Sequence, residues 1–172
     1  MNSVSEELNN SNGRKLLCLE VNPPKGVDCA KVFNRLDKHL KSVDFFNITD
    51  SALARMRMNP MVFAAELKKR YDVEPLVNMS CRDRNLIAMQ GDLLAGWMMG
   101  VRSVIALTGD AISVGDSPDS KGVFEVNSVG LLGAVNKLNA GEDLVGNKLQ
   151  GCLLYTSPSP RDRTRSRMPS SA

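Results

Sequence analysis

The sequence predicts an α/β fold with a parallel sheet, and three observations support that prediction. Four short apolar runs begin at Lys15, Asp44, Glu74 and Ser103, at intervals of 29, 30 and 29 residues. Between these runs lie segments whose apolar residues recur with helical spacing. A polar residue stands at the same place near the end of each run. Strands that alternate with helices at this period form parallel sheets with helices on the outside.

Each predicted helix has recognisable residues at its start. Asp28 is the expected cap of the first helix, and Asn59, followed by a proline, suits the N-cap of the second. The third is expected to start after Asp83, and the fourth near Asn127 or Ser128. The four apolar stripes are Val32, Phe33, Leu36 and Leu40; Phe63, Ala64, Leu67 and Tyr71; Leu86, Met89, Leu93 and Trp97; and Leu131, Leu132, Val135 and Leu138.

The polar residues at the strand ends favour one kind of α/β fold. Glu20, Thr49, Asn78 and Thr108 are separated by 29, 29 and 30 residues. In (β/α)8 barrels, the carboxyl ends of the strands carry the active site. An open dinucleotide-binding sheet would also place its ligand there, but the first turn, EVNPPKGVD, lacks the G-x-G-x-x-G pattern. The predicted fold is therefore a truncated (β/α)8 TIM barrel, with about the first four β/α units.

The composition is that of a globular protein with balanced charges over most of its length. Apolar residues make up 42% and charged residues 24% of the 172 residues, which is ordinary. The net charge of +3 resides in residues 151–172, with four arginines and one aspartate. The sequence has neither a membrane-length apolar run nor a secretory leader, so we expect a cytoplasmic protein with no membrane partner. Four scattered cysteines and a single histidine, His39, predict no metal site.

The chain resembles the methylenetetrahydrofolate reductase family from about Lys15 to Gln150. The matching pieces are LEVNPPKG (19–26), NITDSALARMRMNP (47–60), VNMSCRDRN (77–85), ALTGD (106–110) and GDSPDSKGVFEVNS (115–128). The resemblance implies the N-terminal half of an FAD-binding catalytic barrel. It also implies reduction of 5,10-methylenetetrahydrofolate to 5-methyltetrahydrofolate with NADH or NADPH as donor, in a homo-oligomeric full-length protein.

The resemblance implies that Glu20 and Asp110 are catalytic and bind the folate. Glu20 matches the general acid that protonates the leaving nitrogen, a task that suits a carboxylic acid held partly protonated by apolar surroundings. An ion pair with Lys25 is the alternative. Gly109 would let the backbone approach a flat ring, and the charge of Asp110 would favour a cationic folate. A surface turn is the alternative for this pair.

The resemblance also implies a set of residues that bind the cofactor. Asn78 stands where many members have histidine, and Thr108 stands where some have arginine. The long stretch 111–127 corresponds to a loop that passes over the flavin, with a surface loop as the alternative. We expect Arg82 and Arg84 to form ion pairs rather than to contact phosphate. The implied cofactor-binding residues are Thr49, Asp50, Ala52, Asn78, Thr108, Gly109, Asp110, Phe124 and Glu125.

The two ends of the chain fall outside the repeats. We expect residues 1–14 to be a flexible N-terminus, 15–150 to form the half-barrel, and 151–172 to be a disordered tail that resembles translated sequencing-adapter read-through. A half-barrel alone is expected to be inactive. Two alternatives remain: a folate- or pterin-dependent methyltransferase barrel without flavin, and a non-enzymatic module whose basic tail binds nucleic acid. We favour the reductase, with no nucleic-acid partner.

Overall fold

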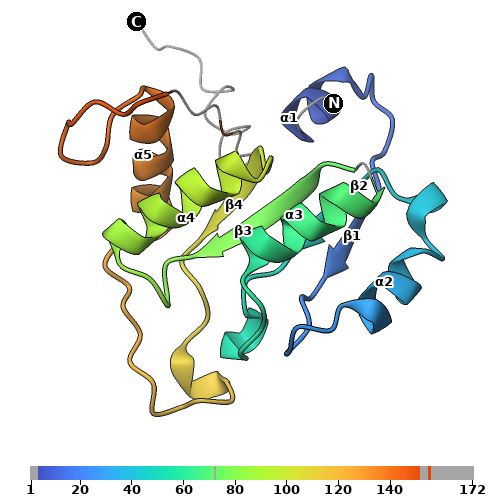
Figure 1. The fold of residues 1–172 in the computed structure, drawn as a ribbon, viewed down its shortest axis with the longest axis horizontal. Coiled ribbons are helices and arrows are strands. Elements are labelled where there is room, and N and C mark those ends of the chain that lie inside the picture. Colours follow the sequence, from blue (N-terminus) through green and yellow to red (C-terminus); the bar gives the residue numbers. More distant parts are fainter. Residues whose placement is uncertain (1–3, 72, 152–154, 156–172) are drawn as a thin grey trace, which may run out of the picture.

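The structure is a computed structural model that describes residues 4–71, 73–151 and 155 (Figure 1). Its sheet has four parallel strands in the order β1-β2-β3-β4. The strands are β1 (Cys18–Val21), β2 (Phe45–Ile48), β3 (Pro75–Ser80) and β4 (Ser103–Leu107). The predicted α/β class is confirmed, and a parallel sheet whose strand order follows the chain is consistent with part of a (β/α)8 barrel.

A helix follows each strand, as the repeat predicts. These helices are α2 (Ala30–Leu36), α3 (Pro60–Tyr71), α4 (Leu86–Met98) and α5 (Ser128–Asn139). Short 3-10 turns occupy Leu40–Ser42, Ala52–Ala54 and Ile112–Val114. Figure 1 shows the helices on one side of the sheet. None of the helices in the described part of the chain has the length and apolar character needed to cross a membrane.

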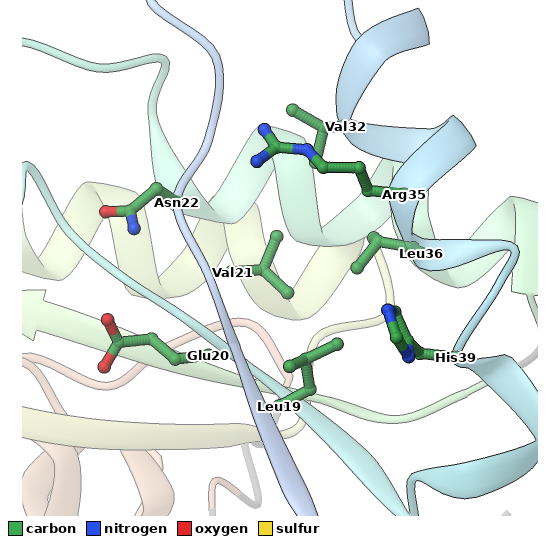
Figure 2. Close-up of a pocket in the computed structure, with 8 residues that line it drawn as sticks. All are labelled: Leu19, Glu20, Val21, Asn22, Val32, Arg35, Leu36 and His39. Atoms are coloured by element: carbon green, nitrogen blue, oxygen red, sulfur yellow. The ribbon is translucent and has the colours of Figure 1, made fainter.

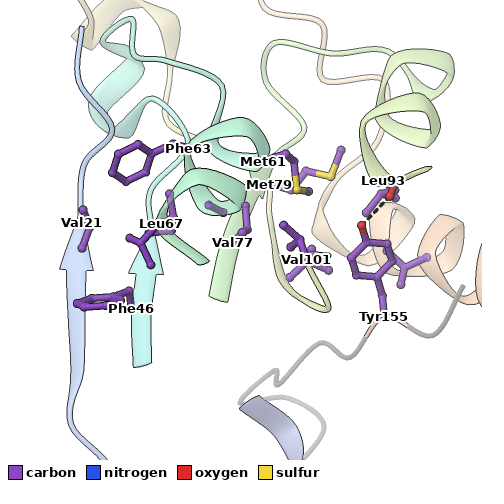
Figure 3. Close-up of a cluster of buried hydrophobic side chains, with 14 of the residues drawn as sticks. Val21, Phe46, Met61, Phe63, Leu67, Val77, Met79, Leu93, Val101 and Tyr155 are labelled. Carbon is purple, nitrogen blue, oxygen red and sulfur yellow. Dashed lines mark hydrogen bonds between the residues drawn. The ribbon is translucent and has the colours of Figure 1, made fainter. Parts of the chain in front are cut away.

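The core lies between the sheet and this helical layer. Phe46, Ile48 and Val77 have no exposed surface, and they pack with Phe63 and Leu67 of α3 (Figure 3). Because successive residues of a strand point to opposite faces, Asn78 and Ser80 face away from this core. The sheet therefore has one apolar face under these four helices, and the polar side chains of Asn78 and Ser80 lie on its second face.

Side-chain caps confirm two of the predicted helix starts and correct a third. The Asn59 Oδ1 accepts a hydrogen bond from the Met61 N–H at 2.9 Å, and Asn127 caps α5 in the same way. The third helix is capped by Asn85, not by Asp83. The helix predicted after the first strand, α2, already ends at Leu36, so Leu40 lies in the following 3-10 turn instead of on the predicted stripe.

A short helix, α1 (Val4–Asn10), occupies the segment that was expected to be flexible. Val4 is 1% exposed and packs with Phe45 and Leu76, on the face of the sheet opposite the main core. Its backbone N–H donates to Ser103 Oγ at 3.3 Å. The prediction for residues 4–10 was therefore wrong, because this helix covers apolar side chains near the amino ends of the strands.

Tyr155 belongs to the predicted tail but packs against the body of the protein. Its hydroxyl donates to the Leu93 carbonyl at 2.6 Å, and its ring meets Trp97 edge-on (Figure 3). Burial raises the pKa of this phenol. The prediction of disorder does not hold at residue 155, and for residues 152–154 and 156–172 it lies outside the described residues.

Candidate functional site

A cleft of about 320 Å³ lies at the carboxyl ends of the four strands. Parallel strands bring their carboxyl ends to one edge, which is why residues about thirty positions apart meet there. All of the predicted site residues except Phe124 and Glu125 line this cleft. Its lining comprises Glu20, Thr49, Asp50, Ala52, Asn78, Ser80, Arg82, Leu107, Thr108, Gly109 and Asp110.

Glu20 lies on β1 and is exposed. Figure 2 shows Glu20 and Asn22 on the opposite side of β1 from Val21, which faces α2. The apolar surroundings expected for Glu20 are thus not formed by the described residues. The alternative of a Glu20–Lys25 ion pair is also not found, since the Lys25 Nζ binds Asp116 at 2.9 Å. Glu20 is therefore presented to the cleft from an edge strand.

Two buried polar residues form the floor of the cleft. Thr49 is 4% exposed, and its hydroxyl donates to Asn22 Oδ1 at 2.9 Å. Asn78 is 8% exposed, and its Oδ1 is buried without a hydrogen-bond partner among the described residues. The Oδ1 of Asn47, on the neighbouring strand β2, is also buried without a hydrogen-bond partner among the described residues. Buried oxygens of this kind are uncommon and are usually satisfied by water or a ligand.

Asn47 was missed by the sequence analysis although it stands opposite Glu20 in the register of β1 and β2. The sequence did contain a sign of it, because one amide interrupts the apolar run DFFNIT. Strand alternation could therefore have placed Asn47 on the face of the sheet that carries Glu20.

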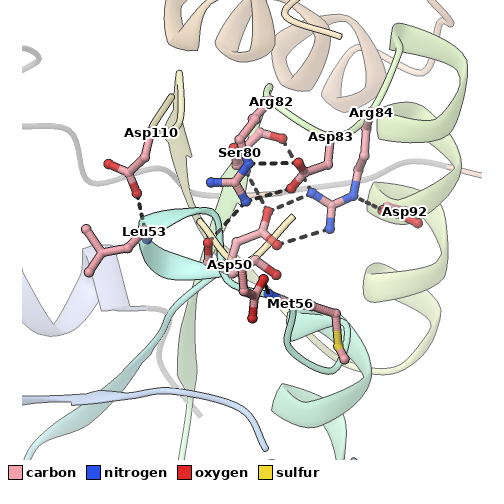
Figure 4. A network of polar contacts seen from close by, with 11 residues as sticks. Asp50, Leu53, Met56, Ser80, Arg82, Asp83, Arg84, Asp92 and Asp110 are labelled. Carbon is pink, nitrogen blue, oxygen red and sulfur yellow. Dashed lines mark hydrogen bonds and ion pairs between the residues drawn. The ribbon is translucent and has the colours of Figure 1, made fainter. Parts of the chain in front are cut away.

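Asp50 is held by protein groups in a buried ion pair (Figure 4). Its carboxylate accepts two hydrogen bonds from Arg84, at 2.6 and 3.2 Å, and a third from the Ser80 N–H at 2.8 Å. The Arg84 Nε in turn contacts Asp92 at 2.7 Å. Arg82, 2% exposed, pairs with Asp83, whose hydrogen bonds raise the pKa of that guanidinium. The predicted ion pairs of both arginines are confirmed.

Gly109 is required by its neighbours in the protein. Its φ is +100°, and a Cβ there would clash with Ser80 Oγ and lie 2.9 Å from Arg82 Cβ. Gly109 was predicted to approach a flat ring closely. In this structure, the group that it approaches closely is the end of β3. The carboxylate of Asp110 projects from this turn, and its Oδ2 accepts from the Leu53 N–H at 2.8 Å (Figure 4).

The segment that Asp110 holds has a strained backbone. Ser51, Leu53 and Ala54 have φ values of 45°, 56° and 51°, in a left-handed region that residues other than glycine rarely adopt. Two groups hold this segment. The Leu53 N–H donates to Asp110, and the Ser51 carbonyl accepts a hydrogen bond from Arg82 at 3.1 Å. Strain that is fixed by several neighbouring groups is typical of binding and catalytic sites.

Asp116 connects three loops and lines a second pocket, which shares Arg82 with the cleft, and the sequence analysis did not select it. Its Oδ2 lies 2.9 Å from the Lys25 Nζ, and its Oδ1 accepts from the Met56 N–H at 3.0 Å. The hydrogen bond from Lys25 lowers the pKa of this carboxyl group. Asp116 thus ties the loop after β4 to the loops after β1 and β2.

Three predicted cofactor residues have roles within the protein itself. The Glu125 carboxylate accepts from the Leu86 N–H at 2.6 Å at the start of α4. The Phe124 N–H donates to the Cys81 carbonyl at 3.2 Å; the residue is 41% exposed and does not line the cleft. The Thr108 Oγ1 accepts from the Ser128 N–H at 3.2 Å while still lining the cleft. The structure therefore does not bring Phe124 and Glu125 to the predicted site.

Comparison with known proteins identifies the family of this chain. Within the described residues, no three His, Cys, Asp or Glu side chains come together to hold a metal ion. The search of curated proteins finds no match. Residues 4–143 match the family described as methylenetetrahydrofolate reductase, which is well over half of the chain. On this match, and with a parallel α/β sheet of the expected kind, the chain belongs to the methylenetetrahydrofolate reductase family.

Proposed function

We propose that this chain supplies part of the active site of a flavin-dependent reductase. The reaction is reduction of 5,10-methylenetetrahydrofolate to 5-methyltetrahydrofolate, with NADH or NADPH as the source of hydride. The observation that carries the proposal is the meeting of Glu20, Thr49, Asn78 and Asp110 in one cleft. The family match supports the same reaction.

The residues of the cleft fit an isoalloxazine ring. Asn78 offers a buried amide oxygen that has no partner among the described residues, and a flavin N–H group is a suitable donor for it. Thr49 adds a hydroxyl beside it, and Ala52 is small enough to leave room for a ring. When bound, FAD supplies the hydride chemistry, accepting hydride from the nicotinamide and passing it to the folate.

The chain's own acidic residues would handle the proton and the charge. Glu20 would donate a proton to the folate nitrogen that leaves as the five-membered ring opens. Asp110 would stabilise the positive charge that then develops on the folate. The hydrogen bond from Leu53 fixes one oxygen of Asp110, so the carboxylate keeps its orientation without help from the substrate.

Turnover should depend on more of a barrel than the described sheet contains. Its four strands leave one side of β1 and one side of β4 without a partner strand among the described residues, whereas a closed barrel of this class has eight strands. We expect the 172-residue chain alone to bind FAD weakly and to show little reductase activity. Clear turnover by this chain would contradict the half-barrel proposal while leaving the flavin site intact.

Titration of the chain with FAD, followed by flavin absorbance and fluorescence, tests the proposed site. The informative variant is Asn78→Leu, which keeps the volume but removes the amide. It should weaken FAD binding by about tenfold, the value of roughly one hydrogen bond. Its free energy of unfolding should not fall, because it also removes a buried oxygen that has no partner among the residues that the structure describes.

The matched control is Asn136→Leu on the exposed side of α5, which should bind FAD as the unmodified protein does. Equal FAD affinity for both variants would overturn the assignment of Asn78. Failure of the unmodified chain to bind any flavin, together with binding of a folate, would favour the methyltransferase alternative.

A further inference from the structure

Arg82 is a buried arginine that has hydrogen-bond donors to spare. Its side chain is 2% exposed, and it lines both the cleft and the second pocket, whose volume is about 250 Å³. Its Nε and Nη2 donate to the two Asp83 oxygens, each at 2.7 Å, and Nη2 also donates to the Ser51 carbonyl at 3.1 Å. A guanidinium has five N–H groups, and these bonds use three of them. The two N–H groups of Nη1 have no partner among the described residues.

The Nη1 nitrogen faces the cleft. In Figure 4 the other two nitrogens of Arg82 carry the marked bonds, whereas the third points away from Asp83, toward the side on which Asp110 is drawn. The hydrogen bond to Asp83 is the main cause of the raised pKa of Arg82, and the charges of Asp50 and Asp110 add to it. Because Asp50 and Asp110 both line the cleft, the guanidinium lies beside the space where a ligand would bind.

The neighbouring arginine shows how a purely structural guanidinium is satisfied in this loop. The Nε of Arg84 binds Asp92 at 2.7 Å, and its two Nη nitrogens bind the oxygens of Asp50. Each nitrogen of Arg84 therefore has a partner, and this residue does not line the cleft. Buried donors are normally satisfied, so the free Nη1 of Arg82 indicates a partner from outside the described residues.

The charges around Arg82 favour a neutral acceptor over an anion. The two arginines of this loop lie among four carboxylates, those of Asp50, Asp83, Asp92 and Asp110. Two positive charges therefore face four negative ones, and a phosphate group would add further repulsion. A carbonyl oxygen accepts hydrogen bonds from Nη1 without adding a charge.

We propose that Arg82 is a further binding residue of the cleft, and that its Nη1 donates to a carbonyl oxygen of the flavin's pyrimidine ring. This inference rests on the proposed function, which assigns an isoalloxazine ring to the cleft. The pyrimidine ring carries both N–H and C=O groups, so it can donate to the buried Asn78 oxygen and accept from Arg82. Asn78 on β3 and Arg82 just after it both line the cleft.

Binding of FAD and of two thio-analogues tests this contact. In 2-thio-FAD and 4-thio-FAD, sulfur replaces one carbonyl oxygen of the pyrimidine ring, and sulfur is a weak hydrogen-bond acceptor. One of the two analogues should bind the unmodified chain about tenfold more weakly than FAD does. Arg82→Lys keeps a positive charge beside Asp83 but removes the Nη1 donors. This variant should bind FAD about tenfold more weakly, and it should bind FAD and that analogue with equal affinity.

Arg84→Lys is the matched control, because it makes the same change in an ion-paired arginine that does not line the cleft. Both variants should lower the free energy of unfolding, which urea titration measures. Arg84→Lys should nevertheless keep the tenfold difference between FAD and the thio-analogue. The larger size of sulfur acts alike in all three proteins, so the comparison isolates the hydrogen bond from Arg82.

Three results would overturn the assignment of Arg82 while leaving the proposed flavin site at Asn78 in place. The first is an Arg82→Lys variant that binds FAD as tightly as the unmodified chain. The second is an unmodified chain that binds FAD and both analogues equally. The third is a thio-analogue whose loss of affinity is the same in Arg82→Lys as in the unmodified chain. An unmodified chain that binds no flavin would instead overturn both this contact and the proposed function.

Discussion

The two ends of one strand in this protein carry opposite chemistry. On β3, Leu76 joins Phe45 and Val4 in a small apolar cluster, while Asn78, two residues further along the same face, lines the cleft. On β2, Phe45 and Asn47 show the same change over the same distance. Strand alternation selects the face, and the direction of the strand then separates an apolar amino end from a polar carboxyl end.

This difference separates stability from function within the same sheet. The amino end excludes water with α1, whose Val4 has almost no exposed surface. The carboxyl end keeps features that lower stability. These are the buried oxygens of Asn47 and Asn78, which have no hydrogen-bond partner in the described part of the chain, and the left-handed turn at 51–54. Unfavourable local features are retained at sites where binding or catalysis requires them. Substitutions at the two ends should therefore affect different measurements.

Phe45→Ala should have the largest effect on stability. Phe45 is 8% exposed in the apolar cluster, and removal of a buried phenylalanine ring costs about 3–5 kcal/mol of unfolding free energy. Urea unfolding measures this loss, and FAD titration of the folded protein should give an unchanged affinity. Phe124→Ala is the matched control, because its ring is exposed and its loss should cost about 0.5 kcal/mol or less. Equal destabilisation by the two changes would contradict the separation.

Gly109→Ala should have the next largest effect, at the opposite end of the sheet. The new Cβ would clash with Ser80 and force a left-handed backbone on alanine, at a combined cost of about 3 kcal/mol. FAD affinity should fall as well, because the turn that carries Asp110 must move.

Gly146→Ala provides the comparison for that prediction. Its φ of +93° is similar, but a Cβ there would meet nothing within 4 Å. It should cost only the backbone strain, about 1 kcal/mol, and leave FAD affinity unchanged. If both alanine variants behave alike, close packing at Gly109 is not what shapes the cleft.

The parts of the fold that sequence alone could predict are those that depend on local periodicity. The thirty-residue repeat located all four strands, and the caps at Asn59 and Asn127 located two helix starts. Helix α1 could not be predicted in this way. Isolated helices as short as its seven residues are unstable, and the contacts of Val4 with Phe45 and Leu76 are distant in sequence.

The same distinction applies to the site. Residues at strand ends converge because the strands are parallel, so Glu20, Thr49 and Asn78 were placed together correctly. The loop from 111 to 127 follows no repeat, and the structure leaves Phe124 and Glu125 outside the cleft lining, so their contact with the cofactor stays a prediction. The partners of Asp50 and Lys25 were also beyond sequence reasoning, because Arg84 and Asp116 reach them from other loops.

Asp116→Asn should give the smallest effect, and it tests whether the loops after β1, β2 and β4 are held together by charge. Asparagine keeps the oxygen that accepts from Met56 but loses the charge that attracts Lys25. Because the folded protein lowers the pKa of Asp116, its carboxylate stabilises the fold above the unfolded pKa of about 4, and this contribution is lost as the pH falls through the lower folded value. Thermal unfolding of both proteins should therefore differ near neutral pH and converge in acid. The side chain is 34% exposed, so added salt should also reduce the difference. A difference that persists unchanged in acid would show that the carboxylate charge does not hold these loops.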